Sequence, residues 1–283
     1  MQYARKIENV RFGQERALYG SRDLYLSGCR FEGEEDGGSA VKECENIRAD
    51  GCYMDLRYPF WHVRGLEING CEMTVNCRAA LWYDENVRIA DSVLNGIKAF
   101  RECKNVIMEN VTAVSPEFGW KCENFSVGHC KIVSQYAFFE SSGIEAEDLD
   151  FEGKYSFQYV RNAAFRNSTF RTKDAFWHSK NVTVADSVIE GEYLGWYSEG
   201  LTLIRCRIKG TQPLCYCKNL KLIDCTTEDC DLAFEYSDVE ADIKGGILSV
   251  KNPTSGTITA DEIGNIVITD DSVYPVKSVI KTR

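Results

Sequence analysis

The sequence of 283 residues has no long apolar run, only three histidines and five prolines, and fewer basic than acidic side chains. No stretch approaches the roughly 18 consecutive apolar residues that a membrane-spanning helix needs, so we expect no membrane partner. The 43 acidic and 33 basic residues give a formal net charge of −10, which argues against a nucleic acid as partner. The first nine residues lack the apolar segment of a secretory signal, so we expect a cytoplasmic protein.

Common motifs for cofactors and metals are also missing. A phosphate-binding loop of the pattern Gly-x-x-x-x-Gly-Lys-Ser/Thr is absent. Cys215 and Cys217 stand two apart, but they have neither a second cysteine pair nor a nearby histidine, so a zinc site is not expected. Aspartates do not recur at regular, neighbouring positions along the chain, so no calcium site is predicted. We therefore expect no cofactor and no metal.

What the sequence does contain is an internal repeat. Segments that begin with Asn, Gly or Asp and continue with alternating apolar residues recur along most of the chain. The first three steps between their starts are 23, 19 and 21 residues, and all eight later steps are 19 residues. The repeats start at Asp23, Asn46, Gly65, Asn86, Asn105, Asn124, Gly143, Asn162, Asn181, Gly200, Asn219 and Asp238.

Each repeat has a fixed pattern when its first residue is counted as phase one. Phases two and four are apolar in every repeat and phase three is mostly polar, which predicts a short strand with one face inward. Phase seven is small or apolar and phase nine is usually aliphatic or aromatic, which indicates a second strand after a turn. Phases fourteen to eighteen form a third segment. The Asn, Gly or Asp at phase one fits a left-handed corner.

Three short strands per repeat without helical periodicity predict an all-β fold, a single-stranded right-handed parallel β-helix of about twelve coils. A left-handed helix of hexapeptides would bury Lys131 and Asp150, so we exclude it. We expect a single domain over residues 1–283. It has an N-terminal cap and short coil at 1–22, regular coils at 23–244 and a non-repeat C-terminal cap at 245–283.

Four segments of the chain also resemble a known family. They are Phe12-Gly13-x-Glu15-Arg16-Ala17-Leu18, Gly38-Ser39-x-Val41-Lys42-Glu43, Tyr58-Pro59-x-Trp61, and the tail from Lys251-Asn252-Pro253 to Asp261-Glu262-Ile263-Gly264. They are similar to the signature segments of an uncharacterised bacterial family, domain of unknown function 3737. The resemblance implies a right-handed β-helix of the pectin-lyase-like type. It implies no reaction and no catalytic residues, because the family has none assigned.

The thirteen cysteines follow the repeat and not a metal or disulfide pattern. Six of them stand at phase seven and four at phase eighteen, where sister coils carry Ser or Val. Cysteines that stack coil on coil behave as small buried apolar side chains. Because the number is odd and the chain is expected to be cytoplasmic, we predict free thiols.

Aromatic residues are placed just as regularly. All five tryptophans fall at phase sixteen, and phase seventeen carries Tyr, His, Glu or Lys and so must face solvent. Two interpretations of the tryptophans remain open, an aromatic ladder inside the helix or a groove along its outer face. A groove of this kind would suit a carbohydrate or another extended ligand. Its candidate binding residues are Trp82, Tyr83, Trp120, Tyr159, Trp177, His178, Trp196, Tyr197 and Tyr216.

The only candidates for catalysis are Glu102, Glu140 and His178. The two glutamates share phase seventeen two coils apart, hence on the order of 9–10 Å between backbones. This separation is near that of the carboxyl pair in inverting glycosidases. Lys121 lies between them, so a surface ladder of ion pairs is the alternative. Three functions therefore remain: a binder of carbohydrate-like ligands, a glycoside hydrolase or polysaccharide lyase acting on an intracellular sugar, and a scaffold. The pattern makes no prediction of oligomeric state.

Overall fold

The computed structural model describes residues 3–33 and 38–283, and in these residues the regular elements are all β-strands. They form two compact units, divided between Glu145 and Ala146, which we describe separately. Strand β21 (Ser142–Glu147) spans this division. In the described ranges no helix is long and apolar enough to cross a membrane.

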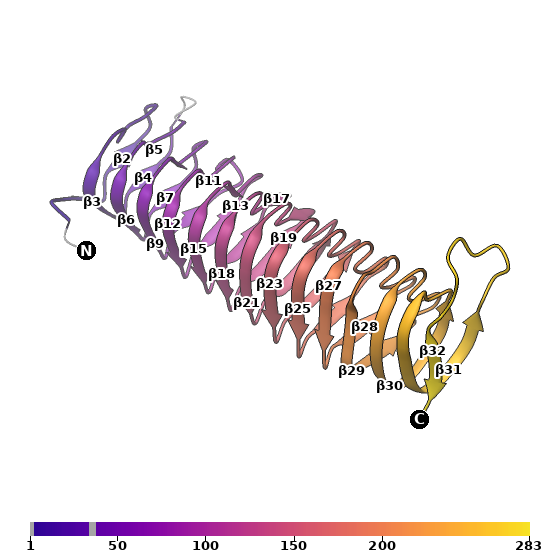
Figure 1. The fold of residues 1–283 in the computed structure, drawn as a ribbon. Helices are drawn as coiled ribbons and strands as arrows, with labels where there is room; N and C mark the ends of the chain where they lie inside the picture. Colours follow the sequence, from indigo (N-terminus) through magenta and orange to yellow (C-terminus); the bar gives the residue numbers. More distant parts are fainter. Residues whose placement is uncertain (1–2, 34–37) are drawn as a thin grey trace. The chain divides into compact units, whose positions relative to one another are not determined.

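The first unit is a stack of short parallel strands (Figure 1). Equivalent phases lie on one another, so Leu66 pairs with Val87, and Val87 in turn pairs with Val106. One row consists of β1 (Arg5–Glu8), β3 (Arg22–Ser27), β6 (Glu45–Asp50), β9 (Arg64–Asn69), β12 (Glu85–Ala90), β15 (Lys104–Glu109) and β18 (Glu123–Gly128). The second row consists of β2 (Arg11–Phe12), β4 (Arg30–Phe31), β7 (Tyr53–Met54), β10 (Glu72–Met73), β13 (Val93–Asn95), β16 (Thr112–Val114) and β19 (Lys131–Ser134).

A third row completes the coils of the first unit. It has two-residue strands, of which the second residue is a tryptophan in β8 and β11. The row consists of β5 (Val41–Lys42), β8 (Phe60–Trp61), β11 (Leu81–Trp82), β14 (Phe100–Arg101), β17 (Glu117–Phe118) and β20 (Tyr136–Ala137). The predicted parallel β-helix with three strands per coil is confirmed here.

The second unit keeps the parallel pairing but not the third strand. Its first row is β23 (Arg161–Arg166), β25 (Lys180–Ala185), β27 (Glu199–Ile204), β29 (Leu220–Glu228), β30 (Asp238–Lys251), β31 (Ser255–Val267) and β32 (Val279–Thr282). Its second row is β22 (Asp150–Lys154), β24 (Thr169–Lys173), β26 (Val188–Glu190) and β28 (Arg207–Lys209). In β29, β30 and β31 one long strand covers both rows, as their pairings show.

In the second unit the third segment is a turn and not the predicted strand, because residues with positive φ recur there at every second position. Phe176 and His178 have φ angles of 60° and 53°. The segment still bonds to its neighbours, since the Phe176 N–H donates to the Ser156 carbonyl at 3.0 Å. A stack of hydrogen-bonded turns therefore replaces the third row of strands.

The segment predicted as a non-repeat cap, 245–283, continues the parallel pairing of the coils. Strand β30 pairs with β31 in parallel from Asp238↔Ser255 to Lys251↔Val267, and β31 pairs with β32 from Thr257↔Val279. The repeat shortens to 17 residues and then lengthens to 22, so a 19-residue period no longer aligns the apolar positions. With these coils and the one begun by β1, the chain makes about fourteen turns in place of twelve.

The core follows the predicted phases. Phenylalanines at phase fifteen, such as Phe100 and Phe176, are at most 1% exposed, and Phe157 stacks on Phe176 at 5.1 Å. Phase-one residues are left-handed as expected: Asn105 has a φ of 54°, and its side-chain amide donates to Asn86 at 3.0 Å. All thirteen cysteines are buried free thiols.

Candidate functional site

The residues at phase seventeen of the second unit form a column of stacked rings, which we call the tyrosine column: Tyr159, His178, Tyr197 and Tyr216. Successive ring centroids are 4.9, 5.0 and 4.6 Å apart, with interplanar angles of 6°, 8° and 10°. Each residue has a positive φ between 53° and 62°. Each backbone N–H donates to a carbonyl of the next coil, as from His178 to Trp196 at 2.9 Å. The turn geometry thus fixes one outward ring per coil.

Stacking decides which part of the column a ligand can reach. Inside the column the flat faces of the rings cover one another, so no sugar ring can lie on them. The ring edges and the phenol hydroxyl groups remain accessible, since Tyr159 and Tyr197 are 44% and 46% exposed. Phenol hydroxyls both donate and accept hydrogen bonds. The column therefore presents a row of hydrogen-bonding groups, one per coil, with a ring face open only at an end.

The tryptophans match neither of the two predicted positions, the interior of the helix and an open groove on its outer face. All five are half-buried, neither inside the core nor fully in solvent. Trp177 and Trp196 stack at 5.4 Å with an interplanar angle of 2°. Their indole N–H groups donate to the carbonyls of Tyr193 and Gln212 at 2.8 and 2.7 Å. Because the polar atom of each indole is engaged by the backbone, these rings support the column and are less open to a ligand than it is.

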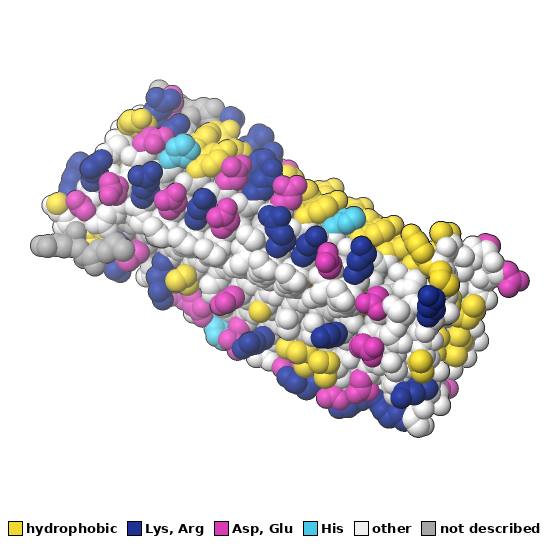
Figure 2. Space-filling view, viewed as in Figure 1, with side chains coloured by type: hydrophobic (Ala, Val, Ile, Leu, Met, Phe, Trp, Pro, Cys, Tyr) yellow, Lys and Arg dark blue, Asp and Glu magenta, His cyan; other side chains and the backbone are white. Residues whose placement is uncertain are grey.

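A depression of about 650 Å³ lies at the C-terminal end of the tyrosine column. Tyr216 and Tyr236 open a wedge there, with centroids 5.8 Å apart and rings tilted by 50°, and Tyr274 lies edge-on to Tyr236 at 5.3 Å. The depression is lined by Tyr197, Tyr216, Cys217, Lys218, Tyr236, Asp238, Thr254, Ser255, Tyr274, Pro275 and Lys277. Figure 2 shows a band of hydrophobic side chains, in yellow, along the upper edge of the surface in this view.

Tyr236 takes the place at phase seventeen that the sequence pattern gave to Glu235. The Tyr216 N–H donates to the Glu235 carbonyl at 2.7 Å, the same bond that Tyr197 makes to Cys215. The coil thus contains one inserted residue. Phe234, which the 19-residue pattern places at phase sixteen with the tryptophans, is buried at 1% exposure. The 20-residue spacing from Cys217 to Ser237 could have revealed this insertion.

The polar groups of the depression differ in their hydrogen-bond partners and in their charge. Asp238 accepts hydrogen bonds from the Asn219 N–H at 3.2 Å and from the Ser255 hydroxyl at 2.6 Å. Burial, and next the negative charge of Glu235, raise the pKa of Tyr216 to about 12, so its hydroxyl keeps its proton at neutral pH. Tyr216 thus adds a neutral hydroxyl donor to the aromatic surface of the depression.

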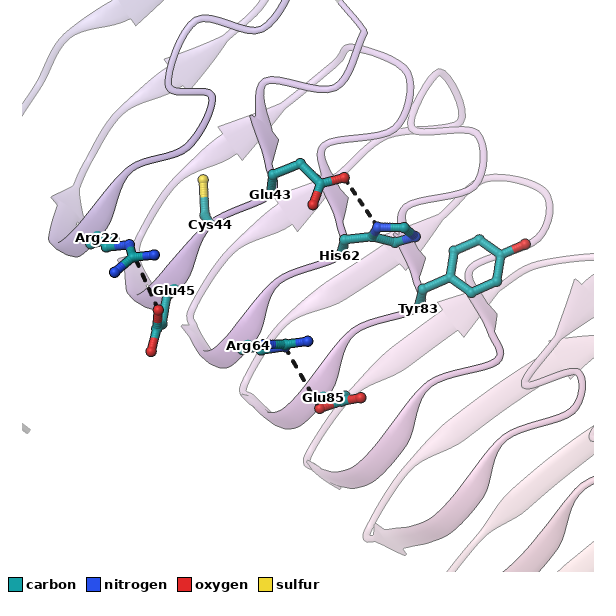
Figure 3. Close-up of a pocket in the computed structure, with 8 residues that line it drawn as sticks. All are labelled: Arg22, Glu43, Cys44, Glu45, His62, Arg64, Tyr83 and Glu85. Atoms are coloured by element: carbon teal, nitrogen blue, oxygen red, sulfur yellow. Dashed lines mark ion pairs between the residues drawn. The ribbon is translucent and has the colours of Figure 1, made fainter.

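The first unit has a separate polar groove of about 410 Å³ (Figure 3). His62 lies at its centre, with Nδ1 3.1 Å from Glu43 Oε1 and its ring edge-on to Tyr83 at 5.0 Å. The groove is lined by Arg22, Glu43, Cys44, Glu45, His62, Arg64, Tyr83 and Glu85. Two looser ion pairs border it, Arg22–Glu45 at 3.7 Å and Arg64–Glu85 at 4.0 Å. The predicted residue Trp82 packs on Trp61 and Tyr83 beside the groove.

Trp120, the remaining predicted binding residue, contacts other groups. Its ring lies 5.7 Å from the Arg101 guanidinium and 5.3 Å from the Phe139 ring. Its indole N–H donates to the Tyr136 carbonyl at 2.7 Å. It therefore joins neither the groove nor the tyrosine column.

The two glutamates suggested for catalysis are each matched by a cation. Glu140 lies 3.4 Å from Lys121, and Glu102 lies 3.8 Å from Arg101. The Lys121–Glu140 contact belongs to the surface ladder, whereas Glu102 is matched by Arg101 instead of Lys121. His178, the third candidate, is held between the Tyr159 and Tyr197 rings. Within residues 3–33 and 38–283 no group of three His, Cys, Asp or Glu side chains could hold a metal ion.

Asp84, between Tyr83 and Glu85 of the groove, is a buried acid that sequence reasoning missed. Its side chain is 0% exposed, and Oδ1 accepts the Val63 N–H at 2.7 Å while Oδ2 has no partner. Burial, and next the nearby Cys103 thiol, raise its pKa well above the ordinary range, against a smaller opposite effect of the Val63 N–H. Asp84 therefore holds a proton that an exposed aspartate would lose.

The chain matches one family profile and several solved structures. The profile of the family described as "Protein of unknown function (DUF3737)" matches residues 5–281. Among curated proteins no match is found. The surface protein and adhesin PfbA of Streptococcus pneumoniae is 10% identical, covering 98% of this chain and 85% of its own, with a TM-score of 0.40. The A-module of the Azotobacter vinelandii mannuronan C-5 epimerase AlgE6 is 11% identical, covering 98% and 88%, with a TM-score of 0.31.

Proposed function

The chain belongs to DUF3737, a family of proteins of unknown function, and from the geometry of its own residues we propose that it binds an extended carbohydrate-like ligand. One observation carries the proposal: the tyrosine column ends in a depression of about 650 Å³ where rings and polar groups converge. Pockets of this size with aromatic walls and a few polar groups are typical ligand sites.

The column and the depression would bind in different ways. Along the column, one polar ring recurs per coil, either a phenol or the His178 imidazole, with ring centroids 4.6–5.0 Å apart. A ligand with regularly spaced hydroxyl groups can bond to this row. In the depression, the wedge between Tyr216 and Tyr236 gives access to ring faces, which a sugar ring can cover. The repeat of the helix thus favours a ligand that itself repeats.

Calorimetric titration with a panel of neutral and charged oligosaccharides tests this proposal. Tyr216→Phe keeps the stacked ring and removes only the hydroxyl, so it should weaken binding about 3–10-fold. Tyr236→Ala removes one wall of the wedge and should weaken binding at least about tenfold. Tyr19→Ala is the matched control, since Tyr19 is 54% exposed in the other unit. A panel in which nothing binds would refute the proposal and favour the scaffold.

One observation favours a second candidate, a glycoside hydrolase or polysaccharide lyase. The Glu43–His62 pair lies in the groove of the first unit, and a carboxylate on Nδ1 orients an imidazole for proton transfer through Nε2. Incubation with the same panel, followed by assays for reducing ends and for unsaturated products, tests it. His62→Gln and Glu43→Gln should then abolish turnover, while Glu140→Gln should not. Turnover that survives His62→Gln would exclude this site.

A further inference from the structure

We propose that the ligand of the depression is an acidic glycan, one whose sugar units carry carboxylate or sulfate groups. This inference rests on the proposed binding function and adds the chemical class of the ligand. It follows from two basic side chains that line the depression, Lys218 and Lys277.

Lys218 and Lys277 differ from most basic side chains of the second unit. Neither ammonium group lies within 4.0 Å of a carboxylate in the described part of the chain, and both residues are exposed. Other lysines of this unit are paired: Lys180 lies 3.2 Å from Glu199 and Lys251 lies 2.8 Å from Glu235. Further pairs involve Arg171, Lys173, Arg205, Arg207, Lys209, Lys244 and Arg283.

The one carboxylate that lines the depression does not cancel these charges. Asp238 already accepts two hydrogen bonds from neutral donors, the Asn219 N–H and the Ser255 hydroxyl. Glu235, next to the column, is engaged by Lys251 and only 13% of its side chain is exposed. Two positive charges and one negative charge therefore face the depression, on a chain whose formal net charge is −10.

The neutral groups around the lysines are compatible with an anion. Tyr216 keeps its proton at neutral pH, so it offers a hydroxyl donor and no negative charge. Lysine ammonium groups have three donors and bind carboxylate and sulfate as point charges. A chain of acidic sugars would thus place its ring against the wedge of Tyr216 and Tyr236 and its acidic groups at Lys218 and Lys277.

The experiment compares three probes of equal length by calorimetry: a neutral hexasaccharide, the corresponding hexamer of uronic acids, and a sulfated hexasaccharide. Lys218→Gln and Lys277→Gln should each weaken binding of an acidic probe about 3–10-fold at low salt and leave the neutral probe unchanged. Raising the ionic strength should weaken acidic probes only, because salt screens exposed charges. Lys221→Gln is the matched control, an exposed lysine of the same unit that does not line the depression.

Each outcome separates this inference from the proposed function. Equal binding of neutral and acidic probes that is lost in Tyr236→Ala but kept in both lysine variants overturns the acidic ligand and leaves glycan binding intact. An equal loss in Lys221→Gln shows unspecific attraction and also overturns it. No binding of any probe refutes both. Preference for one acidic probe over the other names the source of the anion, carboxylate or sulfate.

Discussion

Asp84 provides the sharpest test of the interior of the first unit. Its carboxyl group is 0% exposed, and Oδ2 has no hydrogen-bond partner. In other coils the same position holds Cys, Ser or Val. Ser141 shows that a hydroxyl accepts the backbone bond equally well, from the Cys122 N–H at 2.9 Å. Asp84→Ser should therefore keep the bond from Val63 and remove a group that the core does not accommodate.

The expected gain follows from the two ways in which the acid destabilises the fold. Burial raises the pKa of the Asp84 carboxyl group, so the folded chain forgoes ionisation free energy that the unfolded chain gains, and this cost grows as pH rises above the ordinary pKa. An unpartnered buried oxygen costs about 1–3 kcal/mol more. The smaller serine leaves a small cavity, which offsets part of the gain. We expect Asp84→Ser to raise the free energy of unfolding by up to about 1–3 kcal/mol near pH 4 and by more at pH 7.

The dependence on pH identifies the cause. Because the folded-state pKa of Asp84 is raised, the wild type has its full stability below the unfolded pKa near 4 and loses it as pH rises toward the folded value. The advantage of the variant should thus be smallest near pH 4 and grow by about 1.4 kcal/mol per pH unit above it. Urea unfolding at several pH values measures this slope, and Asp84→Asn, which cannot ionise, should remove it too. A gap that does not change with pH would refute the reasoning.

Three further predictions concern the packing of the second unit and the thiols. Val184 is 0% exposed, while Thr183 on the same strand is half-buried and points outward. Val184→Asp should therefore prevent folding, and Thr183→Asp should change the free energy of unfolding by less than about 1 kcal/mol. Melting curves followed by circular dichroism measure both. Trp177→Ala should lower stability by about 1–3 kcal/mol, because it removes a stacked, half-buried ring and its hydrogen bond; a loss near 5 kcal/mol would indicate a core position. Alkylation followed by intact mass should find all thirteen thiols after denaturation and few before it, and bridged cysteines would contradict the free-thiol prediction.

The buried positions could be predicted from the sequence wherever the repeat kept its period. An apolar residue at phases two and four must be buried in any stack of coils, so Val87 and Val106 could be placed without knowledge of their neighbours. The third segment was less determined. A strand and a row of turns both bury phase fifteen and expose phase seventeen, so the pattern around Phe176 could not distinguish them.

The binding site was harder to predict because its residues lie where the period fails. Tyr236 was missed through one inserted residue, and Tyr274 and Lys277 belong to coils of other lengths. The Glu43–His62 contact could not be predicted for another reason. It depends on the directions of two side chains on adjacent coils, which the spacing of residues in the sequence does not specify. The sequence could thus predict the tyrosine column up to Tyr216, but not the depression at its end.

The stacked rings have an optical consequence. Trp177 and Trp196 lie parallel at 5.4 Å, and Tyr197 and Tyr216 are nearly parallel at 4.6 Å. Chromophores this close share their excited states, so the near-ultraviolet circular dichroism of this unit should contain a coupled signal that no single ring produces. The signal exists only while successive coils stay in register. This coupled signal therefore reports the spacing of successive coils. It can be used to follow the formation of the coils or the binding of a ligand without an added label.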